Sequence, residues 1–258
     1  MSQFHTTRYL RTMNLRNPSV TTSLIIINIV VFLVGMMVQK DALLGIAFPS
    51  SHEKESIFHI LGAYSWFTCF MEGQIWRMVT YQFLHANLGH LIFNMWALYF
   101  FGPVIEQIMG SRKFLAYYLA CGVSGALFSS LLASMGLYVS LPTNAETMQA
   151  VNALAQYVGY EGIVMPWQMI PMVGASAAIY GVMVAATFLF PDVRISLLFP
   201  PVTLKLRTFA LLIIIFASAT ILFNWSNAGG EAGHLGGIIM GAIIMICWKL
   251  HHKFTYNR

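Results

Sequence analysis

A serine and a histidine lie in long uncharged stretches of this chain. Ser176 lies within the uncharged window 162–191, and His234 lies within the window 232–248. Ionisable groups at membrane depth are costly and are usually functional. A hydroxyl and an imidazole are also the minimum set for a nucleophile activated by a general base. The two residues therefore predict hydrolysis in an apolar environment.

Each residue also has a purely structural interpretation. A small residue such as Ser176 often packs between membrane helices, and a single histidine such as His234 often makes an interhelical hydrogen bond. The glycines nearby favour the functional interpretation. Gly237 and Gly241 lie three and seven residues after His234, on roughly one helix face, with the spacing of a close-approach motif. Close packing there would bring Ser176 within reach of His234.

A third group of polar side chains lies in the segment 85–94. His90 and Asn94 are four residues apart, so they share one face of the predicted helix. Both side chains donate hydrogen bonds, as acyl transfer requires at the developing oxyanion. The backbone amides of Ala175 and Ser176, in the first turn of the predicted helix that carries the serine, are expected to add further donors for this oxyanion. No His-Glu-x-x-His arrangement is present, so no metal site is predicted.

Composition indicates that these residues lie in a lipid bilayer. The chain is 58% hydrophobic and 9% charged, whereas a soluble domain carries roughly a quarter charged residues. The apolar runs are continuous, which favours helices over a barrel, and about 20 apolar residues span a bilayer. We expect an all-α polytopic membrane protein with six transmembrane helices, at about 20–38, 88–107, 114–136, 173–190, 206–224 and 232–250.

The net charge of +5 follows from the expected topology. With the N-terminus in the cytoplasm, eleven Lys and Arg residues lie on the inner side and three on the outer side. This positive-inside bias explains the charge without a nucleic-acid partner. The expected domains are a cytoplasmic tail at 1–19, a six-span region at 20–250 and a second cytoplasmic tail at 251–258. The three cysteines are widely spaced and form no metal motif, so no cofactor is expected.

The connecting segments carry their own predictions. The large first outer loop, 39–77, contains an apolar part at 57–71 that is expected to be interfacial or re-entrant. The loop after the third span is expected to be partly helical and to lie on the membrane surface. The polar segment 225–231 is expected to be a loop that caps the site and gates access to it.

Together the motifs resemble those of the rhomboid intramembrane serine proteases. The stretches similar to the family's nucleophile, base and second-helix motifs are Gly174-x-Ser176, Ala232-Gly233-His234-x-x-Gly237-x-x-x-Gly241 and His85-x4-His90-x3-Asn94. Three further matches are similar to the family's pattern. They are Trp76-Arg77 in the first loop, Glu106 with Gly110 at the end of the second helix, and Tyr180 as the aromatic residue on which the histidine stacks. The resemblance covers nearly the whole membrane region.

The resemblance implies a serine endopeptidase that cleaves transmembrane protein substrates with a dyad of Ser176 and His234. It implies that His90 and Asn94 help to form the oxyanion hole, and that Tyr180 stacks on the catalytic histidine. No cofactor or metal is implied. A chain of this size without appended domains is typical of a bacterial inner-membrane protein, so we expect that location.

Two residues near the pair bear on this interpretation. The family usually has Gly directly after the nucleophile, where this chain has Ala177. Its methyl group would either crowd the sixth span or be absorbed by the glycines around His234. Glu231 precedes the histidine by three residues, in the predicted outer loop, and is expected to be solvated rather than a third catalytic group.

Two other functions stay open. A catalytically inactive rhomboid-like protein would bind transmembrane helices without cleaving them. Ala177 is the feature that favours it, and the retained serine and histidine favour the protease. A small transporter would require paired charges within the spans or two matching broken helices, and the sequence has neither.

Overall fold

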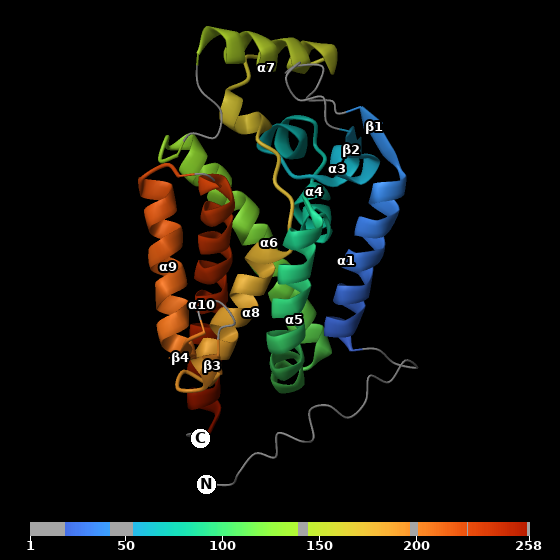
Figure 1. The fold of residues 1–258 in the computed structure, drawn as a ribbon. Helices are drawn as coiled ribbons and strands as arrows, with labels where there is room; N and C mark the ends of the chain where they lie inside the picture. The colour runs from blue at the N-terminus through green and yellow to red at the C-terminus, as the bar shows by residue number, and fades with distance from the viewer. Residues whose placement is uncertain (1–18, 42–53, 139–143, 197–200, 226, 257–258) are drawn as a thin grey trace.

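The computed structural model describes residues 19–41, 54–138, 144–196, 201–225 and 227–256, so nearly all of the predicted tail at 1–19 lies outside it. The described chain forms a bundle of apolar helices with shorter elements across one end (Figure 1). Within these ranges four helices are long and apolar enough to cross a membrane: α1 (Val20–Met37), α5 (Leu88–Met109), α6 (Ser111–Ser134) and α10 (Ala228–Tyr256). Two shorter apolar helices accompany them: α8 (Ser176–Leu189) and α9 (Leu206–Leu222).

These helices coincide with the six predicted apolar segments, and the largest difference is in α10. It begins at Ala228 and continues to Tyr256, beyond the predicted limits of 232–250. The segment 225–231 is therefore only partly a loop, because its second half is the first turn of α10. Gly229 and Gly230 disfavour a helix on propensity alone. The hydroxyl of Ser129 on α6 donates to the Gly229 carbonyl at 3.0 Å, and this contact holds the turn.

Side-chain caps mark where two of the long helices begin. The Ser19 hydroxyl accepts a hydrogen bond from the Thr22 amide at the start of α1, and Asn87 accepts one from the His90 amide at the start of α5. Such caps satisfy amides that have no partner within the helix. Gly110 separates α5 from α6 with a φ of +80°, a conformation that a residue with a Cβ rarely adopts.

Short elements lie in the long connection between α1 and α5. They are β1 (Gln39–Asp41), β2 (Lys54–Ser56), α3 (Ile57–Gly62), the π-helical turn η2 (Phe67–Met71), α4 (Arg77–Thr80) and the 3₁₀ turn η3 (Tyr81–Phe83). Strands β1 and β2 pair antiparallel, as do β3 (Arg194–Ser196) and β4 (Thr203–Lys205) between α8 and α9. The chain is therefore mostly helical rather than all-helical, and the predicted element at 57–71 is two short helical pieces.

The loop after α6 contains the helix α7 (Ala145–Tyr157) and the 3₁₀ turn η4 (Pro166–Met169). Figure 1 shows α7 lying across one end of the bundle, at the top of the view, roughly perpendicular to the long helices. Val151 and Leu154 of α7 belong to a small buried cluster that includes Phe67 of η2. This part of the loop is helical, as predicted, and it packs on the first loop.

Arg77 holds the first loop together from within. Its guanidinium donates to the carbonyls of Ala63 and Ile60 at 2.8 and 2.9 Å, and to the side chain of Gln74 at 2.6 Å. Arg77 is buried, whereas the neighbouring Trp76 is 54% exposed. The two residues of this predicted structural motif therefore lie in different surroundings, and Arg77 makes the hydrogen bonds.

The short helix α8 lies at the centre of the bundle, packed against α5, α6 and α10. Nine of its 14 residues are buried. The backbones of α8 and α10 approach closely at glycines. A Cβ at Gly237 would overlap the Ala177 carbonyl, and one at Gly241 would lie 3.0 Å from the Gly181 Cα. The close-approach motif predicted on the last span therefore contacts α8 directly.

Hydroxyl groups add polar contacts between the helices. Ser124 on α6 donates to the Gly236 carbonyl of α10 at 3.0 Å, and Tyr117 donates to the Gly181 carbonyl of α8 at 2.6 Å. Such hydrogen bonds supplement van der Waals packing in lipid, where helices gain little from the hydrophobic effect. Together with the glycines they fix α6, α8 and α10 relative to one another.

The Glu106 carboxylate joins the other side of the bundle. It lies near the end of α5 and accepts hydrogen bonds from the Val20 amide at 2.8 Å, the Thr21 amide at 2.8 Å and the Thr21 hydroxyl at 2.7 Å. The Ser111 hydroxyl of α6 donates a fourth bond at 2.6 Å. An anion at a helix N-terminus is also favoured by the helix dipole. Glu106 thus connects α1, α5 and α6.

We predict that Glu106→Ala lowers the free energy of unfolding by about 2–4 kcal/mol, because hydrogen bonds to a charged group contribute about 1.5–3 kcal/mol. Glu106→Gln should cost less, since an amide oxygen still accepts. The thermal midpoint of the purified protein in detergent measures both effects. Glu161→Ala, at an exposed position, is the matched control. An equal shift in the control and in Glu106→Ala would refute the structural role of Glu106.

Candidate active site

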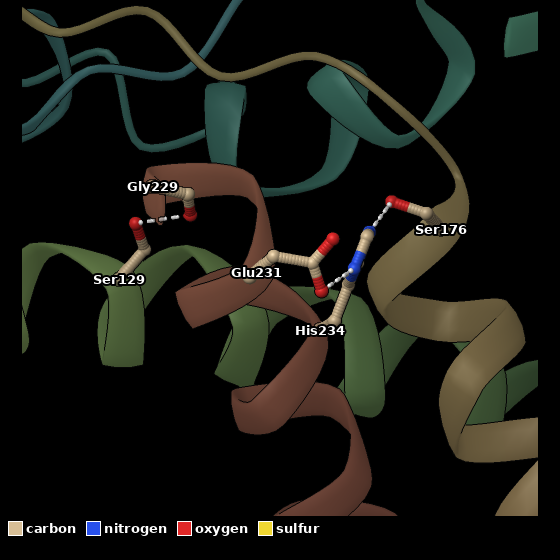
Figure 2. Close-up of polar contacts among 5 residues, drawn as sticks. All are labelled: Ser129, Ser176, Gly229, Glu231 and His234. Atoms are coloured by element: carbon tan, nitrogen blue, oxygen red, sulfur yellow. Dashed lines mark hydrogen bonds and ion pairs between the residues drawn. The ribbon is translucent and has the colours of Figure 1, made fainter. Parts of the chain in front are cut away.

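Ser176 and His234 are brought into direct contact. Ser176 is the first residue of α8, and His234 lies near the start of α10. The Oγ of Ser176 is 2.8 Å from the Nε2 of His234, a hydrogen-bonding distance (Figure 2). Both side chains are only partly buried. The geometry expected from the glycine pattern is therefore present, across 58 residues of sequence.

Tyr180 lies beneath the imidazole. Its ring stacks on that of His234, with centroids 4.1 Å apart and planes inclined by 8°. Tyr180 follows Ser176 by four residues, so both side chains lie on one face of α8. The same helix thus supplies the hydroxyl and the surface on which the imidazole rests.

Glu231 is also in contact with His234, contrary to the expectation from sequence. Its Oε2 lies 2.9 Å from the Nδ1 of His234, and the residue is 8% exposed (Figure 2). The expected solvation is wrong because α10 begins at Ala228. A spacing of three residues within a helix places two side chains on one face. The three-residue spacing is the sequence signal for this contact, but Gly229 and Gly230 make a helix at Glu231 look unfavourable.

His90 and Asn94 lie at the same site, on α5. Gly174 has a φ of +131°, and a Cβ there would lie 2.8 Å from the His90 ring and 3.5 Å from the Ser176 Oγ. The His90 ring and the serine hydroxyl therefore flank Gly174. Asn94 is buried, and its Nδ2 finds no acceptor among the described residues. A buried amide without a partner is a donor available to a ligand.

His85 does not line the cavity that His90 and Asn94, the other two members of its motif, line. It is 1% exposed, and it packs on the His90 ring with centroids 5.0 Å apart. Burial, reinforced by the neighbouring His90, lowers the pKa of His85 to about 3. His85 is therefore neutral at physiological pH and behaves as a packing residue beneath His90.

Ala175 and Ala177 flank the serine and are both buried. The Ala177 methyl faces α6, where a Cβ on Gly125 would overlap it. Gly125 thus provides the space that Ala177 needs. The expected accommodation by glycines around His234 is only partly right, because the methyl itself meets a glycine on α6. The departure from the family pattern has a local structural compensation.

A cavity of about 1470 Å³ opens at these residues. Ser176, His234, His90 and Asn94 line its polar part. Its apolar part lies between α5 and α9, where the lining includes Trp96, Phe100, Phe209 and Ile213. Trp225 and Asn227, in the connection between α9 and α10, also line it. The described part of the segment predicted as a cap therefore borders the cavity.

A sequence profile of the rhomboid domain matches residues 72–250, which include every site residue described above. The chain belongs to the rhomboid family. It is 31% identical to rhomboid protease AarA of Providencia stuartii over 183 residues, which are 70% of this chain and 58% of that protein. Two more rhomboid relatives extend the comparison to another bacterium and to a plant.

Rhomboid protease GluP of Bacillus subtilis is 27% identical over 171 residues, 66% of this chain and 25% of that protein. RHOMBOID-like protein 12, mitochondrial, of Arabidopsis thaliana is 30% identical over 193 residues, 73% of this chain and 50% of that protein. The chain thus matches less than two thirds of the length of each of these three relatives.

We predict that Gly125→Ala destabilises the fold, because overpacking a tight contact costs about 1–3 kcal/mol. Ala177→Gly removes the facing methyl, so the double variant should recover part of the loss. Recovery is incomplete because a Cβ at Gly125 also lies 2.8 Å from the Gly233 carbonyl. Thermal midpoints of the four proteins form a double-mutant cycle. Additive shifts would show that the two positions are not in contact.

Proposed function

We propose that this rhomboid-family protein is an intramembrane serine endopeptidase with Ser176 as nucleophile and His234 as general base. The distance of 2.8 Å between Oγ and Nε2 carries the proposal. A serine is a weak nucleophile until a neighbouring base accepts its proton. The named proteases among the relatives support the same reaction class.

The reaction follows from the positions of the two groups. The Ser176 Oγ adds to the scissile carbonyl carbon while its proton passes to the Nε2 of His234. The imidazolium then delivers this proton to the leaving amine, and an acyl-enzyme ester is formed. Water, deprotonated by the same imidazole, hydrolyses the ester and restores Ser176.

The developing oxyanion requires donors that are in place before the reaction. We assign this role to His90, to the Nδ2 of Asn94 and to the Ser176 amide, at the N-terminus of α8. The first amides of a helix have no partner within it. The Asn94 amide is likewise without an acceptor among the described residues. Donors that are already desolvated and unpaired stabilise charge with little reorganisation.

The substrate class follows from the walls of the cavity. Aromatic and aliphatic side chains of α5 and α9 line its apolar part, which suits a transmembrane segment. A helical substrate has to unwind locally before its peptide bond reaches Ser176. Figure 1 shows that α1 begins and α10 ends at the same end of the bundle. Six crossings with both termini in the cytoplasm, in a bacterial inner membrane, fit this arrangement.

The first test uses the purified protein in liposomes with reporter substrates, each carrying one destabilised transmembrane helix. We expect cleavage by the native chain and none by Ser176→Ala, because the nucleophile is lost. Ser134→Ala, at an exposed serine at the end of α6, is the matched control and should cleave normally. Absence of cleavage by folded native protein with several reporters would contradict the proposal and favour the helix-binding alternative.

A second test addresses the oxyanion donors. Asn94→Ala should lower kcat by roughly 10²–10³-fold, the effect of removing one such donor. KM should change little, because the bond strengthens only as charge develops on the oxygen. Single-turnover cleavage by the variant measures this, and an unaltered thermal midpoint verifies the fold. A native-like kcat would remove Asn94 from the mechanism.

A further inference from the structure

Glu231 is a buried acid whose surroundings require an explanation. Its side chain is 11% exposed, and the ion pair that it makes within the described chain is with His234. A buried carboxylate is costly unless a partner compensates it. Its position in the first turn of α10 supplies part of that compensation through the helix dipole. The Nδ1 of His234 supplies the hydrogen bond.

Hydrogen bonds hold the backbone of the first turn of α10, which carries Glu231. The Glu231 amide donates to the Asn227 carbonyl at 3.0 Å. Two residues before Glu231, the Gly229 carbonyl accepts from the Ser129 hydroxyl of α6, as Figure 2 shows. Ser129 in turn lies 2.8 Å from the Tyr138 hydroxyl. The backbone that carries Glu231 is thus anchored through α6 as well as through its own helix.

The contact with Glu231 selects one tautomer of His234, which stacking on Tyr180 does not do. Stacking on Tyr180 fixes the plane of the imidazole ring, but it does not determine which ring nitrogen carries the proton. A carboxylate only accepts hydrogen bonds, so it selects the tautomer with the proton on Nδ1. The lone pair of Nε2 then faces the Ser176 Oγ at 2.8 Å. This is the tautomer that a general base at His234 requires.

We propose that Glu231 is a positioning residue that extends the dyad to a hydrogen-bonded triad of Glu231, His234 and Ser176. This inference rests on the proposed function. The proton moves from the Ser176 Oγ to Nε2, while the Nδ1 proton stays on the ring. The carboxylate keeps its charge and stabilises the imidazolium that forms. Tyr180 fixes the plane of the ring, and Glu231 fixes its tautomer and its rotation within that plane.

The test compares Glu231→Gln and Glu231→Ala with the native chain in liposomes. Glu231→Gln keeps an acceptor but removes the charge, and we expect kcat to fall roughly ten- to hundredfold with KM within about twofold. Glu231→Ala also frees the ring, so kcat should fall further. Glu231→Asp should restore part of the rate. The rate at which a fluorophosphonate labels Ser176 should fall in Glu231→Gln and fall further in Glu231→Ala. This rate measures the reactivity of the Ser176 hydroxyl and does not require the substrate to bind.

The pH dependence separates positioning from packing. Within the part of the chain that the structure describes, the polar groups that face His234 are Ser176 and Tyr180 from α8, His90 from α5 and Glu231 on α10 itself. The substitution of the one carboxylate among them removes the negative charge that stabilises the imidazolium. The acidic limb of kcat/KM should therefore move to lower pH in Glu231→Gln. A purely structural role would lower the thermal midpoint and leave this limb in place.

Glu161→Gln serves as the matched control, since Glu161 is exposed. The inference is overturned when native protein cleaves and Glu231→Gln matches it in kcat, labelling rate and pH profile. It is equally overturned when the variant loses stability alone. Absence of Ser176-dependent cleavage and labelling in the native chain is a different result, because it refutes the proposed function and the inference with it.

Discussion

The backbones of α8 and α10 approach more closely than side chains would permit, and the contact between Ser176 and His234 depends on that approach. Gly237 lies against the Ala177 carbonyl, and Gly241 lies against Gly181. In a bilayer such packing has to replace the hydrophobic effect as the force that joins helices. A slip of one helix by one turn, about 5.4 Å, would separate Ser176 from His234. Glycines whose Cβ positions are occupied by the partner helix make that slip sterically unfavourable, so the fold itself sets the reactive distance.

Polar groups inside the bundle differ in how many hydrogen bonds they make. Two groups that join elements make several: Glu106 accepts four, and Arg77 donates three. The Nδ2 of Asn94, which lines the cavity, makes none among the described residues. In an apolar medium an unused donor is costly, and the contacts of Glu106 and Arg77 stabilise the structure that carries it. The residues that join the elements are thus different from those that line the cavity.

The sequence predicted the six apolar helices and the contact between Ser176 and His234, because hydrophobic runs and glycine spacing are local signals. It also placed Tyr180 beneath the imidazole through the family resemblance. Three features escaped prediction. Gly229 and Gly230 weaken the helical pattern and so predict a loop at Glu231, although a hydrogen bond from α6 holds that turn in the helix. The meeting of Ala177 with Gly125 depends on packing between distant segments, which a single sequence does not encode. The short strand pairs carry too few residues to show a period of two.

The 14 residues of α8 make a helix only about 21 Å long, whereas the hydrocarbon layer is about 30 Å thick. Ser176 is at one end of this helix. A helix of this length cannot place both of its ends at the boundaries of that layer. When the end opposite Ser176 lies at one boundary, the length of α8 alone keeps the hydroxyl short of the other. One inserted residue would move Ser176 by about 1.5 Å and turn it by about 100°, so depth and direction cannot be adjusted separately.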